Sequence, residues 1–169
     1  MASGAQELAN ECKRQSDNCL YTSTALFIWL RFLRWGKALF TAVPLILGSL
    51  ATWNLLTSSD LSAVRLTTAV LAFIAGLLPA IYRALKCDDH LEQCKHLAAE
   101  FKNLQDRFRQ AALVSSRGPY PEFDAEFKAL MERMEKARSF SVTAPEWCFK
   151  RAQRKIKSGD YDFDVDLAQ

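Results

Sequence analysis

The residues best suited to hold a metal ion are the cysteines and histidines between positions 87 and 96. Cys87, His90 (or Leu91) and Cys94 fall on one face of a predicted helix, and His96 is close by. The usual zinc motifs instead pair cysteines two to four residues apart across a turn. Small thiols buried at a helix seam fit this spacing better, so we expect no bound metal and no cofactor.

Catalysis by a nucleophile needs a base and an orienting partner close by. The only two histidines, His90 and His96, lie on a charged predicted helix, and no nucleophile elbow accompanies them. Gly48 and Gly76 stand alone inside apolar sequence, so they form no phosphate-binding loop. A net charge of +3 is too mild for nucleic-acid binding, which needs a concentrated basic stripe. The sequence therefore predicts neither an enzyme nor a nucleic-acid partner.

The one basic cluster lies at 150–157, interleaved with apolar residues. Such a cluster can bind anionic lipid, a nucleotide phosphate or an acidic protein, although a solvated helix face is the simpler interpretation. Aspartates then alternate with apolar residues from 160 to 167, which indicates an extended segment. We expect this region to hold the gating residues, namely two apolar anchors and three cations that meet either the aspartates or an anionic trigger: Trp147, Ile156, Arg151, Arg154 and Lys155.

Small and polar residues are the informative feature of the apolar sequence between 38 and 82. They recur at helical spacing on one face of each of two segments, and pairs of small residues four apart let helix backbones approach closely in lipid. This packing could close a hairpin within one subunit or join several subunits. The candidates for helix packing or for lining a pore are Thr41, Gly48, Thr52, Thr68, Ala72 and Gly76.

The elements that must position these residues are two apolar runs. Residues 38–59 contain no charge over 22 positions, and residues 66–82 none over 17. The first is long enough for a hydrocarbon core of roughly 30 Å, and flanking arginines can snorkel to extend the second. The alternative, two buried helices of a soluble bundle, leaves too little apolar sequence to surround them. We therefore predict membrane spans at 38–57 and 64–83.

Flanking charges predict the orientation of this hairpin. Basic residues precede the first span and follow the second, and only Arg65 lies between the spans. The positive-inside rule then places both termini in the cytoplasm, and Ser59 or Asp60 is suited to cap the second helix. Aromatic residues near the expected membrane interfaces are Trp29, Trp35, Trp53 and Tyr82.

Helical seams flank the spans. Residues 8–33 and 87–112 both carry apolar or small residues at alternating steps of four and three, so we expect the two seams to pack together and the second span to continue into 87–112 as one helix. Further helices are predicted at 121–138 and from Pro145 to Gly159. The predicted protein is an all-α membrane protein with an amphipathic helix at 1–36, a two-transmembrane hairpin at 37–86 and a cytoplasmic helical region at 87–169.

This layout resembles the SLATT family of two-transmembrane effector domains. The resemblance covers nearly the whole chain: the aromatic and basic approach from Trp29 to Lys37, the two spans, the long helix after them and the ending APEWCFKRAQRKIKSGDYDFD from Ala144 to Asp164. It implies an oligomeric, pore-forming effector of the bacterial inner membrane in anti-phage or other conflict systems, triggered by a nucleotide signal or a sensor protein. The alternative is a membrane-anchored scaffold or regulatory subunit without a pore.

Overall fold

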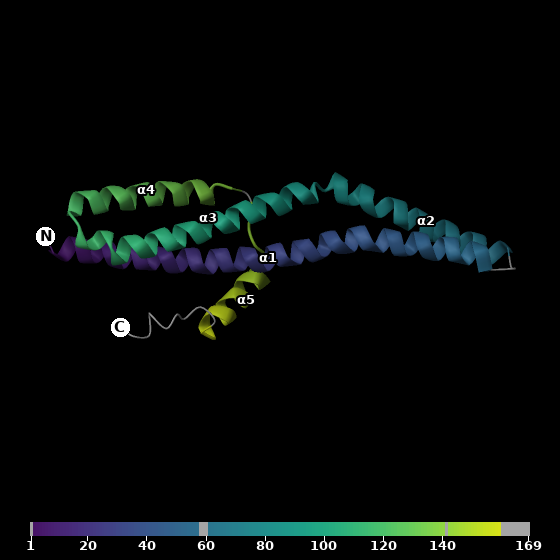
Figure 1. Ribbon diagram of the computed structural model, residues 1–169, viewed down its shortest axis with the longest axis horizontal. Coiled ribbons are helices and arrows are strands. Elements are labelled where there is room, and N and C mark those ends of the chain that lie inside the picture. The colour runs from purple at the N-terminus through teal and green to yellow at the C-terminus, as the bar shows by residue number, and fades with distance from the viewer. Residues whose placement is uncertain (1, 58–60, 141, 160–169) are drawn as a thin grey trace. The chain divides into compact units, whose positions relative to one another are not determined.

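This computed structural model describes residues 2–57, 61–140 and 142–159, and all the regular secondary structure of these residues is helical (Figure 1). The helices in chain order are α1 (Ala2–Thr57), α2 (Leu61–Ala84), α3 (Cys87–Leu113), the short 3-10 helix η1 (Ser115–Arg117), α4 (Tyr120–Arg138) and α5 (Glu146–Lys157). The predicted all-α class is confirmed. The chain divides into two compact units, which we call the head unit (Met1–Leu30 with Gln93–Gln169) and the hairpin unit (Arg31–Glu92).

The core of the head unit is the seam between the first half of α1 and helix α3. Ser16 donates a hydrogen bond from its hydroxyl to the carbonyl oxygen of Gln105 (3.1 Å), and the Cys94 thiol donates to the carbonyl oxygen of Leu26 (3.7 Å). These contacts confirm that the two predicted seams pack together. The buried residues along them, which face one another as the spacing requires, are Cys12, Gln15, Cys19, Leu26, Cys94, Ala98, Phe101, Gln105, Phe108 and Ala112.

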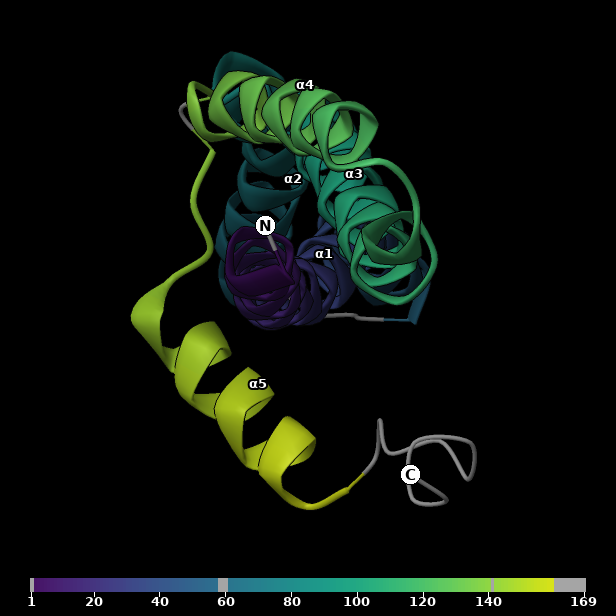
Figure 2. The same ribbon diagram turned by 90° about the vertical axis from the view of Figure 1, so that its left-hand side faces the viewer.

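Helix α4 covers this seam. Pro119 precedes the first residue of α4, in keeping with the fixed φ of proline, which suits the start of a helix, and the helix begins one residue before the predicted position. Phe127 of α4 meets Phe108 edge-on at a centroid distance of 6.2 Å, and Met134 lies 3.9 Å from the Cys19 sulfur. Figures 1 and 2 agree that α4 lies beside α3, whereas α5 lies beside α1.

The predicted continuous helix from the second span into 87–112 is wrong. Helix α2 ends at Ala84 and α3 begins at Cys87, with Lys86 between them at φ 48°. That left-handed conformation disfavours a residue with a β-carbon by roughly 1–2 kcal/mol, so it marks a break between two helices. Residues 85–92 nevertheless stay within the hairpin unit.

The hairpin unit contains the two apolar helices, the second half of α1 and α2. Both are long and apolar enough to cross a membrane by length and composition. In the most apolar window of each helix, only 6% and 0% of the residues are buried, so neither helix is buried as a core helix within this chain. The predicted turn with its capping residues Ser59 and Asp60 lies outside the described residues.

Candidate functional site

Between residues 38 and 82, the described surface of the hairpin unit is mainly apolar. Large side chains stand exposed along both helices, for example Leu45 at 69%, Leu66 at 70% and Phe73 at 69% of their full accessibility. Ala51 is the only described residue between 31 and 92 that is buried. Leaving five large apolar side chains in water rather than burying them would cost about 8 to 15 kcal/mol. This cost is as large as the net stability of a typical domain. This surface therefore requires an apolar environment or an apolar partner.

Two of the predicted packing residues, Gly48 and Gly76, do not contact the opposite helix of the hairpin. A β-carbon added at Gly48 or Gly76 meets no neighbouring atom within 4 Å, and Ala72 is exposed. Close packing at these glycines within one chain therefore has no support, whereas packing between copies stays a prediction.

The threonines among these candidates differ from one another. Thr41 and Thr52 each donate a hydrogen bond to the carbonyl four residues earlier in α1, at 3.0 Å. The Thr68 hydroxyl oxygen in α2 is shielded from solvent and has no hydrogen-bond partner. An unsatisfied hydroxyl is costly in an apolar setting, so Thr68 carries a polar group that its own chain shields and leaves unsatisfied.

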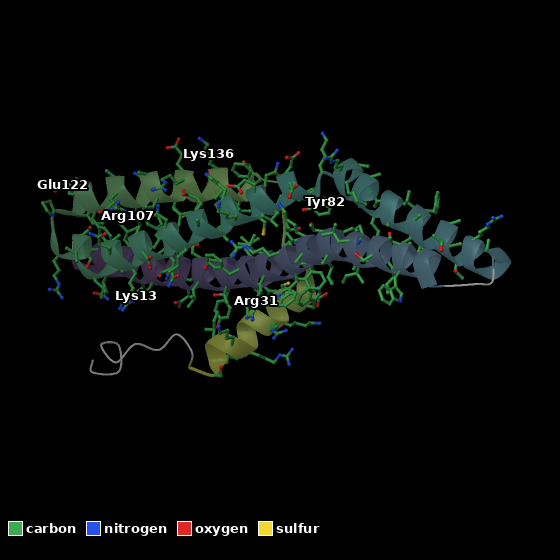
Figure 3. The ribbon with its side chains drawn as sticks, turned by 45° about the vertical axis from the view of Figure 1, so that its right-hand side comes forward. Lys13, Arg31, Tyr82, Arg107, Glu122 and Lys136 are labelled. Carbon is green, nitrogen blue, oxygen red and sulfur yellow. The ribbon has the colours of Figure 1, made fainter. Side chains whose placement is uncertain are left out.

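A polar cluster closes one end of the hairpin unit. The Lys37 ammonium lies 2.7 Å from the Asp88 carboxylate, and the Tyr82 hydroxyl donates to the same carboxylate oxygen at 2.8 Å. The Tyr82 ring, which lies between the two helices in Figure 3, packs against Phe40 at 5.6 Å. Hydrogen bonding to Lys37 and then to Tyr82 lowers the pKa of Asp88, so the carboxylate is charged at neutral pH. The cluster ties α1 to the start of α3 by side chains from three helices.

Helix α5 docks on α1 within the head unit through two small residues. Cys148 and Ala152, four positions apart, are fully buried against Ala25, with Ile28 and Trp29 packed around them. The Trp147 and Trp29 rings meet edge-on at 6.2 Å. Trp29, expected at a membrane interface, thus takes part in the packing of the head unit.

The predicted gating residues divide into a contact group and an exposed group. Trp147 contacts Trp29 but remains 44% exposed, and Ile156 is only half-buried. Burial therefore assigns the main anchors to Cys148 and Ala152, which sequence reasoning missed. The cations Arg151, Arg154 and Lys155 are exposed. Their expected partners, the aspartates from 160 on, lie outside the described residues.

A cavity of about 280 Å³ lies in the head unit between α1, α3 and the segment that leads to α5. Its wall is mainly apolar, and Arg138 supplies the one charged group. Among the described residues, no carboxylate pairs with the Arg138 guanidinium. The lining residues are Thr22, Ala25, Leu26, Leu97, Phe101, Ala137, Arg138, Phe140, Val142, Thr143, Ala144 and Phe149.

The cysteines behind this cavity are buried thiols. Cys94 is fully buried, and burial, with a smaller effect of nearby Cys148, raises its pKa to about 11. Burial also raises the pKa of Cys148. Over the described part of the chain, no three side chains of the metal-binding types come together, and Cys87 lies in the hairpin unit while Cys94 lies in the head unit.

Comparison with known proteins finds no match for this chain among protein-family models, curated proteins or solved structures.

The cavity and the Lys37–Asp88 pair could not be seen in the sequence. The pair joins residues 51 positions apart, and the cavity combines four helices and a connector. A signal did exist for α5, because Cys148 and Ala152 are its small residues at a spacing of one helical turn.

Proposed function

We propose that the protein inserts in a membrane as a two-span hairpin, with both termini and the head unit in the cytoplasm. This proposal rests on the observation that almost no residue of the two apolar helices is buried within the chain. In lipid, these helices satisfy their backbone groups internally and need no protein cover. Basic residues precede the first span and follow the second, and Arg65 is the only basic residue near the turn between them. This distribution favours the cytoplasmic location of both ends.

The inserted hairpin assembles with copies of itself. Two helices are too few to enclose an aqueous path, so a pore needs several hairpins. Two features favour such contacts, the open space at Gly48 and the open space at Gly76. Small residues permit close helix approach in lipid.

The function we infer is that of a pore-forming effector that permeabilises the bacterial inner membrane in anti-phage or other conflict systems. This step rests on the resemblance of the chain to the SLATT family, above all at Ala144–Asp164. One feature of the structure supports a regulated effector. Helix α5 docks on α1 through a contact between a few small buried residues, and a weakly held helix of this kind is suited to regulation.

The test is expression in bacteria with a potential-sensitive dye as the readout. We expect the chain to depolarise cells on triggering or overexpression, and Thr68→Val together with Gly76→Ile to abolish depolarisation while the protein still fractionates with membranes. A reporter active only in the periplasm should be silent after Gln169 and active between Ser59 and Asp60. A strong periplasmic signal at Gln169 would refute the topology.

The alternative, a membrane-anchored scaffold without a pore, predicts a different outcome. A scaffold would show the same topology and membrane fractionation, but no depolarisation at any expression level. The same two measurements therefore separate membrane insertion from pore formation.

A further inference from the structure

We propose that the cavity of the head unit is a binding site for a small amphipathic anion, with an apolar body of up to two fused rings and one acidic group. This inference does not depend on the proposed pore activity, because binding is measured directly.

The size of the cavity sets the size of the ligand. A cavity of 150 Å³ lined by apolar side chains accommodates benzene, and the present cavity of about 280 Å³ is nearly twice that volume. It falls at the lower end of the range for small-molecule sites, which commonly form between the helices of bundles. A two-ring body fits this volume, whereas a long acyl chain exceeds it.

The lining sets the chemistry. Phe101 is buried in the wall on α3, while Phe140 and Phe149 are half-exposed at 47% and 40%. Aromatic side chains favour an apolar or aromatic ligand, because offset or edge-on ring contacts add to the burial of area. Arg138, at the end of α4, is exposed and has no carboxylate partner among the described residues. An unpaired guanidinium beside an apolar cavity selects an acidic group, which it can bind with two parallel hydrogen bonds.

Neighbouring charges reinforce this choice. A second hollow shares Leu97, Ala137 and Phe140 with the cavity. It is lined by the cations Arg133 and Lys136 and by one acid, Glu100, which is already paired with Arg133 at 2.7 Å. Beyond the Glu100–Arg133 pair, the lining of this hollow therefore adds one further cation, Lys136, next to the cavity.

The position of the cavity links occupancy to helix α5. Val142, Thr143 and Ala144 of the connector form part of the wall, and so does Phe149 of α5 itself. A ligand that touches these residues binds only while α5 is docked, so it stabilises the docked form by mass action. Cys148, a residue of α5 that is fully buried against α1, reports this directly through its rate of alkylation.

The probe we choose is 2-naphthoate, with neutral 2-naphthamide as the matched control. Titration calorimetry uses the full chain in nanodiscs of zwitterionic lipid, with empty nanodiscs subtracted. We expect saturable binding of the naphthoate and at least tenfold weaker binding of the amide, in line with the strength of a charge-assisted hydrogen bond. Naphthoate at ten times its Kd should slow Cys148 alkylation about tenfold. Mass spectrometry of the proteolytic peptides measures the extent of Cys148 alkylation in the protein without substitutions.

Variants locate the site. Arg138→Gln should weaken naphthoate binding about tenfold and Arg138→Lys less, because lysine keeps the charge but loses the planar fork. Thr22→Phe, at a half-exposed position of the wall, should fill the cavity and abolish binding. Arg107→Gln removes an exposed arginine that does not line the cavity and should bind normally. Circular dichroism confirms that each variant is folded.

Several results would overturn the proposal. If the heat of titration does not differ from that of empty nanodiscs, the cavity does not bind the probe. If the Arg138→Gln and Thr22→Phe proteins bind naphthoate like the original protein, the cavity is not the binding site. Binding without protection of Cys148 would place the probe elsewhere. A full-length variant with the four aspartates after Gly159 changed to asparagine tests one rival occupant, the chain's own tail. If that variant binds naphthoate at least tenfold tighter, the tail fills the cavity and the assignment to a small molecule is wrong.

Discussion

Enlarging Ala152 should release helix α5 from α1 without unfolding the head unit. Ala152 is fully buried, and with Cys148 it makes the contact between α5 and Ala25. A leucine at this position has no room, and overpacking a tight contact typically costs about 1 to 3 kcal/mol. The docked and released forms of α5 then approach equal populations, because the free energy that holds α5 against α1 is similar to this overpacking cost.

The strength of that contact follows from its parts. Burial of the Ala152 methyl and the Cys148 side chain is worth about 1 to 2 kcal/mol together, and the edge-on contact of Trp147 with Trp29 adds about 0.5 to 1.5 kcal/mol. The sum of about 1.5 to 3.5 kcal/mol is comparable to the overpacking cost of the leucine. A shift of 1.4 kcal/mol changes an equilibrium tenfold, so Ala152→Leu should raise the equilibrium constant for release roughly five- to 140-fold.

Alkylation of Cys148 measures this equilibrium. In the docked form the thiol is buried and its pKa is raised, so few thiolates exist at neutral pH, and reaction requires release of α5. Lys157→Leu, an exposed substitution on the same helix, is the matched control and should react like the original. Cys12, buried elsewhere in α1, should keep its rate in every variant. If Cys12 and Cys148 accelerate together, the bundle has unfolded as a whole and the argument for local release fails.

Two further predictions concern the hairpin unit. Because the pKa of Asp88 is lowered on folding, its interaction with Lys37 stabilises above the ordinary aspartate pKa of about 3.9 and is lost as the pH falls through the lower, folded value. The melting temperature of the original protein should therefore fall more steeply below about pH 4 than that of Asp88→Asn, and equal slopes would exclude this pair. Gly48→Ile and Gly76→Ile should leave helix content unchanged but reduce the oligomer mass in light scattering, whereas an unchanged mass would exclude these glycines from the interface.

The sequence predicted the positions of the helices better than the break between α2 and α3. Spacing of apolar residues located the seam of α1 with α3, and proline and glycine marked the ends of α4 and α5, because these signals are local. The break at Lys86 was missed, since neither proline nor glycine occurs between Ala84 and Cys87. A left-handed lysine carries no local sequence signal, because glycine and asparagine are the residues that usually mark this conformation at the end of a helix.

The candidate site was predicted only where it depends on composition. Length and hydropathy identified the two apolar helices, and Pro145 and Gly159 marked the two ends of α5. The anchors of α5 were assigned to the large residues Trp147 and Ile156, whereas the structure buries Cys148 and Ala152. Large apolar residues are the usual anchors, but the close approach of α5 to Ala25 leaves room only for small ones.

The energies of these contacts decide which part of the head unit a ligand can move. Separating α1 from α3 would expose Leu26, Leu104 and Phe108, all almost fully buried, at a cost of about 5 to 9 kcal/mol. A ligand at 100 times its Kd supplies only about 2.7 kcal/mol, which is insufficient for that change but close to the strength of the α5 contact. We infer that a ligand-driven change in the head unit acts on α5 and the connector at 142–144, whereas the seam of α1 with α3 stays intact in both states.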